Sequence, residues 1–140
     1  MGLTIRGKYD GSPSYDMGAI SFFRLRRDIA YTISDEYGAH YEKMPEACAK
    51  LIDVNDYNAQ TERLIKKYHC KERMLDFLYQ SDTSGKLSPL KCKALHDQIA
   101  ELHNDTLYGY MAYPKDCMTI DKFKEILKEC YDRRTYLVWY

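Results

Sequence analysis

Features that mark membrane-bound or secreted proteins are missing from this sequence of 140 residues. No apolar run approaches the length that spans a bilayer, and the first residues, Met-Gly-Leu-Thr-Ile-Arg, lack the apolar core of a signal peptide. Lys and Arg together number 21, as do Asp and Glu, so no net charge favours nucleic acid or an anionic membrane. We therefore expect a cytoplasmic protein that does not bind membranes, and we do not favour nucleic acid as its partner.

Catalytic and cofactor motifs are also missing. The sequence has no C-x-x-C or H-x-x-x-H pair, no G-x-S-x-G elbow, no P-loop and no dinucleotide fingerprint, so we predict no enzyme activity, no cofactor and no bound metal. The five cysteines are odd in number, which favours reduced thiols. One alternative stays open: Cys92 and His96 share a helical face, and they would complete a zinc site if the fold brought His69 and Cys70 to them.

Tyrosine is used unusually often, with 14 copies against four Phe and one Trp. A tyrosine combines a large ring with a polar hydroxyl, which suits both the boundary of a small core and a surface that contacts a partner. Both interpretations stay open at this point. With 45% hydrophobic and 30% charged residues, the composition is that of one folded domain over residues 1–140.

Apolar periodicity predicts a mainly helical fold of the α+β class, with about five helices. Phe22, Leu25 and Ile29 recur at steps of three and four residues, and Asp16 is the expected N-cap of this first helix. The same stripe runs on toward residue 44, although Gly38 weakens a helix there. Further helices are expected over residues 46–52, over 57–68 after a cap at Asp53 or Asp56, after Ser88-Pro89, and after Thr119. Residues 74–78 either continue the helix over 57–68 or form a separate short helix.

The two ends of the chain carry segments with strand character. Residues 3–5 alternate in polarity, and residues 135–140 are the β-branched and aromatic run Thr-Tyr-Leu-Val-Trp-Tyr. An isolated strand cannot satisfy its backbone N–H and C=O groups, so we expect the N- and C-terminal strands to pair in a small sheet. The stretch 80–86 is expected to be a loop, and 104–116 a loop or strand region.

The loop around Gly85 resembles the calcium-binding loop of an EF-hand. With Gly85 at the sixth loop position, Leu87 falls at the eighth, where EF-hands place an apolar residue. The ligand set is broken, because the first position is Gln80 and the twelfth is Cys92 in place of a bidentate Glu. The resemblance therefore implies a degenerate EF-hand-like helix–loop–helix within residues 71–131, without calcium.

Several short stretches are similar to segments of small uncharacterised proteins that prophages and other mobile elements carry in Gram-positive gut bacteria. They are Arg-Gly-Lys-Tyr at 6–9, Asp-Phe-Leu-Tyr at 76–79, Gly-Lys-Leu-Ser at 85–88, Tyr-Gly-Tyr at 108–110 and Phe-Lys-Glu-Ile-Leu at 123–127. This resemblance implies an accessory protein that works inside a bacterial host cell, and it assigns no activity.

Together these features predict a non-enzymatic interaction protein that binds a host or phage macromolecule, most simply a protein, as in a counter-defence inhibitor. A small-ligand binder, such as a nucleotide sponge, and a small enzyme of unknown class are the alternatives. The candidate contact residues are Arg24, Arg27, Tyr108, Tyr110 and Tyr113, because Arg forks match phosphate and Tyr rings stack on bases. The other interpretation of the two arginines is a solvated helix face.

Overall fold

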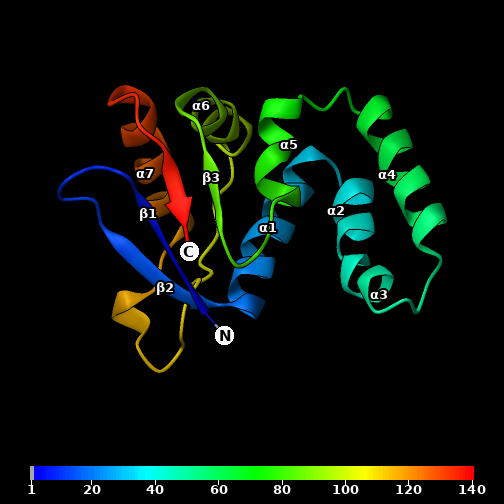
Figure 1. Cartoon of the computed structure of the whole chain (residues 1–140), viewed down its shortest axis with the longest axis horizontal. Helices are drawn as coiled ribbons and strands as arrows, with labels where there is room; N and C mark the ends of the chain where they lie inside the picture. Colours follow the sequence, from blue (N-terminus) through cyan, green and yellow to red (C-terminus); the bar gives the residue numbers. More distant parts are fainter. Residues whose placement is uncertain (1) are drawn as a thin grey trace.

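The computed structural model describes residues 2–140 and confirms the α+β class. Helices dominate, and a four-stranded sheet joins the two ends of the chain (Figure 1). The helices are α1 (Ala19–Ile33), α2 (Asp35–Tyr41), α3 (Met44–Cys48), α4 (Val54–Lys67), α5 (Glu72–Tyr79), α6 (Pro89–Gln98), the short 3-10 helix η1 (Pro114–Asp116) and α7 (Ile120–Asp132). The strands are β1 (Gly2–Gly7), β2 (Ser14–Gly18), β3 (Gly85–Leu87) and β4 (Leu137–Trp139). Within residues 2–140, no helix is both long and apolar enough to cross a membrane.

Within residues 2–140 there are seven α-helices, two more than the approximate five expected; one is added because the segment expected to continue the first helix is divided into α1 and α2. The chain leaves helical geometry at Ser34, whose extended backbone carries a hydroxyl that accepts the Tyr37 N–H and caps α2. Gly38 was expected to weaken a helix, yet it lies inside α2, where a Cβ would collide with the Tyr31 ring. The glycine therefore allows α1 and α2 to pack closely.

The sheet has the strand order β2-β1-β4-β3, and every neighbouring pair is antiparallel. Ile5 lies opposite Trp139, and the Thr4 N–H donates to the Tyr140 carbonyl at 2.8 Å, which confirms the predicted pairing of the two ends. The predicted N-cap at Asp16 is wrong. Asp16 lies in β2 opposite Thr4 and accepts its hydroxyl at 2.5 Å, while α1 begins without a side-chain cap.

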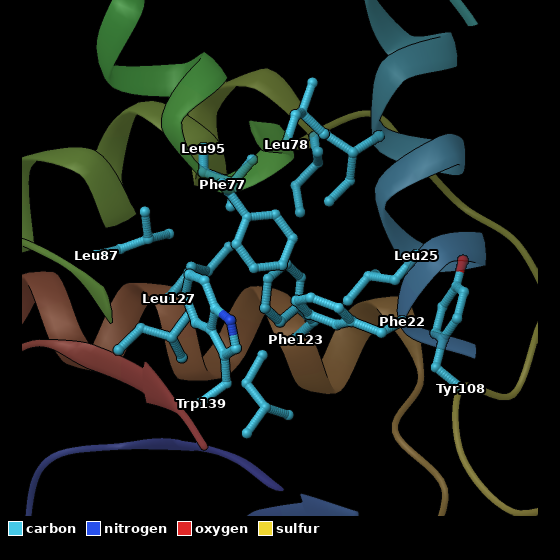
Figure 2. Close-up of a cluster of buried hydrophobic side chains, with 14 of the residues drawn as sticks. Phe22, Leu25, Phe77, Leu78, Leu87, Leu95, Tyr108, Phe123, Leu127 and Trp139 are labelled. Carbon is cyan, nitrogen blue, oxygen red and sulfur yellow. The ribbon is translucent and has the colours of Figure 1, made fainter. Parts of the chain in front are cut away.

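An aromatic cluster fills the space between the sheet and the helices (Figure 2). Phe22 of α1, Phe77 of α5, Phe123 of α7 and Trp139 of β4 are each at most 1% exposed. The Phe77 ring centre lies 5.6 Å from that of Phe22, 5.4 Å from that of Phe123 and 5.3 Å from that of Trp139. Burial of each such side chain contributes roughly 1.5–3 kcal/mol, so this cluster fixes α1 and α5 against α7 and the sheet.

Most of the helix starts predicted from capping chemistry are confirmed. The hydroxyls of Ser88 and Thr119 accept the N–H three residues on, at 3.4 and 3.2 Å, and Asp53 does the same for Asp56 at 2.9 Å. Helices α4 and α5 are separate, because His69 between them has a φ of 52° that no α-helix accommodates. Capping is a local interaction, which explains why residue type alone located these starts.

The loop around Gly85 lies between helices α5 and α6. Its short strand, β3, pairs with β4 and buries Leu87 completely. Further along, Met118 forms an isolated bridge with Tyr108. Helices α5 and α6 are therefore joined by a loop whose short strand, β3, belongs to the sheet through its pairing with the C-terminal strand β4.

Candidate functional site

Two of the five predicted contact residues, Arg27 and Tyr108, meet at one carboxylate. Arg27 donates to Asp28 Oδ1 from Nε at 3.2 Å and from Nη2 at 3.1 Å, and the Tyr108 hydroxyl donates to Asp28 Oδ2 at 2.6 Å. Tyr108 is completely buried, and Asn104 donates to its hydroxyl oxygen at 3.0 Å. Burial and the hydrogen bond to Asp28 raise the pKa of Tyr108. Its ring and hydroxyl are thus occupied inside the protein, holding the loop after α6 against α1 (Figure 2).

The other predicted contact residues lie on the surface in two separate places. Arg24 is exposed on α1. Tyr110 and Tyr113 are 46% and 66% exposed and line a hollow of about 290 Å³ beside β2, together with Lys115. The structure therefore does not gather the five predicted residues into one site.

The cysteine and histidine side chains do not assemble a metal-binding cluster in the part of the chain that the structure describes. Cys92 is buried, and its hydrogen bond with the Cys130 thiol together with burial raises the pKa of Cys92. Cys70 is half-buried, and burial raises its pKa as well. Both shifts favour the protonated thiol, which is neither a good nucleophile nor a metal ligand.

The most buried charged side chain belongs to Arg26, which lies on α1 and is only 6% exposed. Its guanidinium carbon lies 4.3 Å from the Phe22 ring centre, and Nη2 donates to the Ser81 carbonyl at a long 3.3 Å. Nε is buried without a hydrogen-bond partner, and no carboxylate in residues 2–140 lies within 4.0 Å of the guanidinium. Burial lowers the pKa of Arg26, and the Tyr41 hydroxyl and the Asp82 carboxylate oppose that shift.

Arg26 lines a groove of about 540 Å³ between α1, α3 and the loop after α5. Helix α2 runs back beside α1, which brings α3 next to the first turns of α1 (Figure 1). The walls are mostly apolar, and Asp82 is the other charged side chain that lines the groove. We call this feature the Arg26 groove; its apolar lining includes Ala19, Ile20, Phe23, Tyr41, Met44 and Pro45.

The loop that forms one rim of the Arg26 groove is held firmly. The Gln80 side chain bonds both backbone groups of Lys86, donating to the carbonyl at 2.7 Å and accepting the N–H at 3.1 Å. The Trp139 indole N–H donates to the Ser81 carbonyl at 3.0 Å, so the loop is also tied to the aromatic core. The position of Asp82 beside the groove is therefore fixed by contacts on both sides of it.

This arrangement has a clear chemical capacity, since the groove offers apolar contact area around one desolvated cation. It suits a ligand group that is itself apolar and carries one negative charge. In comparisons with known proteins, no family model, curated protein or solved structure matches the chain.

Proposed function

We propose that this protein is a non-enzymatic interaction protein that acts by binding a partner protein in the Arg26 groove. The observation that carries the proposal is the groove itself, whose volume of 540 Å³ and apolar walls provide room and contact area for partner side chains. Two exposed residues lie along it, Ile20 at 73% exposure and Cys48 on α3, so it opens to the surface. Apolar side chains of a partner that become buried in such a groove supply most of the free energy of protein association.

The partner is proposed to be a host or phage protein, and the protein itself an accessory product of a mobile element that inhibits its partner, as in counter-defence. The resemblance of residues 6–9 and 123–127 to such proteins supports this proposal. An inhibitor that acts by occupancy needs a complementary surface and no catalytic group, which agrees with the chemistry described above.

A test of the proposal compares partner capture by groove-filled and control variants. Cys48→Trp places a large ring at an exposed groove position, and Glu101→Trp adds the same ring at an exposed position outside the groove. We expect the natural protein and the Glu101 variant to retain one bacterial protein stoichiometrically from a host lysate, and the Cys48 variant to lose it. Equal capture by both variants, or no capture by the natural protein, would refute the proposal.

A small-ligand binder is the second candidate function, because 540 Å³ lies within the range of small-molecule sites. A ligand at one hundred times its dissociation constant stabilises a protein by about 2.7 kcal/mol, which a thermal-shift screen detects easily. Stabilisation by nucleotides or by other small molecules, with no protein partner retained, would favour this candidate over the first.

A further inference from the structure

We infer that the Arg26 groove recognises a carboxylate of the partner protein, carried by an acidic residue between apolar neighbours. This inference rests on the proposed function and specifies its chemistry. It follows from three properties of Arg26: its burial, its unsatisfied Nε donor, and the scarcity of other charges in the groove.

The first property is a buried positive charge that, among residues 2–140, has no carboxylate within 4.0 Å of it. Desolvation of an unpaired ion is costly, and buried arginines are normally paired with carboxylates. Here the guanidinium is compensated by the ring faces of Phe22 and Phe77, by the nearby Tyr41 hydroxyl and by one long bond to the Ser81 carbonyl, none of which is a contacting anion. A carboxylate that enters the groove would provide the missing counter-charge, so complex formation would recover part of the desolvation cost.

The second property is donor geometry. A guanidinium has five N–H donors in a planar fork, and that fork matches the two oxygens of a carboxylate. In residues 2–140, Nη2 has its bond to Ser81 and Nε has no partner. Because Arg26 lines the groove, its fork can meet a carboxylate that approaches between the apolar walls.

The third property is charge balance, which selects among anions. Among residues 2–140, Arg26 is the one cation that lines the groove, and Asp82 contributes a negative charge at the loop rim. A phosphate carries up to two charges, and a nucleic acid carries one per nucleotide, so both would be repelled by Asp82 with too few cations to compensate. A single carboxylate is repelled less by Asp82 than these anions and matches the one guanidinium, and apolar neighbours of that carboxylate fit the walls.

The test uses two matched peptides, N-acetyl-Phe-Asp-Leu-amide and its Asn counterpart, titrated into the natural protein and followed by NMR. We expect chemical-shift changes at Ala19 and Cys48, which line the groove, and about tenfold tighter binding of the Asp peptide. Equal affinities for the two peptides, no binding of the Asp peptide, or shifts confined to residues outside the groove would overturn the inference. Tighter binding of inorganic phosphate than of the Asp peptide would also overturn it.

Two variants separate recognition from folding. Arg26→Met keeps an unbranched apolar stem and removes the guanidinium, and we expect it to bind the Asp and Asn peptides equally. Asp82→Asn removes a rim charge without touching the buried guanidinium, and we expect it to bind the Asp peptide several-fold more tightly while its affinity for the Asn peptide stays unchanged. The second variant stays informative if the first does not fold; an unchanged affinity for the Asp peptide in Asp82→Asn would overturn the inference.

The lysate experiment distinguishes the inference from the proposed function. If Cys48→Trp abolishes partner capture while Asp82→Asn leaves the affinity for that partner unchanged, the groove binds a protein without reading a carboxylate. If Cys48→Trp has no effect, the proposed function itself fails.

Discussion

The buried hydroxyl of Tyr108 allows a quantitative test, because Tyr108→Phe removes one oxygen atom and leaves the ring packing intact. The hydroxyl donates to Asp28 at 2.6 Å, and a hydrogen bond to a charged group contributes about 1.5–3 kcal/mol. Asp28 is 17% exposed and keeps its bonds from Arg27, so water and that cation compensate part of the loss. We therefore expect the free energy of unfolding to fall by about 2 kcal/mol.

Urea denaturation followed by circular dichroism measures this change. Tyr113→Phe is the matched control, because its ring is 66% exposed and we expect a change below about 0.5 kcal/mol. The double variant Tyr108→Phe, Asp28→Asn tests the cause: if the two side chains stabilise the fold through each other, their effects will be non-additive by about 1 kcal/mol. A loss below about 0.5 kcal/mol in Tyr108→Phe, or additive effects in the double variant, would refute the network as described.

Two further predictions concern stability. Gly85→Ala would drive a Cβ into the Trp139 ring, so we expect a loss of about 1–3 kcal/mol and a changed near-ultraviolet signal from this sole tryptophan; an unchanged signal and stability would show that the ring yields freely. Burial lowers the pKa of His40, so the unfolded chain binds a proton more readily and stability falls as the pH drops through 6.5. We expect His40→Gln to weaken the pH dependence of the urea midpoint between pH 5 and 7.5, whereas His103→Gln, at an exposed position, keeps the pH dependence of the natural protein. The same pH dependence in both variants would contradict this assignment.

Sequence patterns predicted those parts of the fold that depend on local chemistry. Ser88 and Thr119 start helices because a hydroxyl can satisfy an N–H three residues away wherever the rest of the chain lies. The pairing of β1 with β4 was predictable for a different reason, since both terminal segments have strand character and each needs a partner.

Strand β2 was not predictable, because its sequence Ser-Tyr-Asp-Met-Gly has neither the composition nor the alternation of a strand. Its backbone is held in the ladder by its pairing with β1, which is a tertiary effect. Asp16 looked like a helix cap because an aspartate can accept a hydrogen bond either from the backbone at a helix start or from a neighbouring side chain, as it does here from Thr4. The break at Ser34 was missed for a similar reason, since the apolar stripe continues through it from α1 into α2.

The candidate site was missed because sequence patterns treat an arginine as a surface residue. Arg24 and Arg27 do face away from the apolar stripe, whereas Arg26 lies four residues after Phe22 and four before Ala30, both fully buried. That spacing was the available signal: a charged residue within the apolar stripe of a helix points into the protein. The sequence could not show that Arg26 lacks a contacting carboxylate, because that depends on which loop the fold places beside the side chain.

The Ser81 carbonyl links this site to the stability of the whole fold. It accepts from the Trp139 indole at 3.0 Å and from Arg26 at 3.3 Å, so one atom connects the aromatic core with the groove. A core that holds the loop in place also holds Arg26 in its desolvated position before any partner arrives. Binding then does not have to order the guanidinium or the loop, and a preorganised site loses less affinity to conformational entropy. The unsatisfied Nε is therefore positioned by the aromatic core, which is the arrangement expected of a binding site rather than of a packing defect.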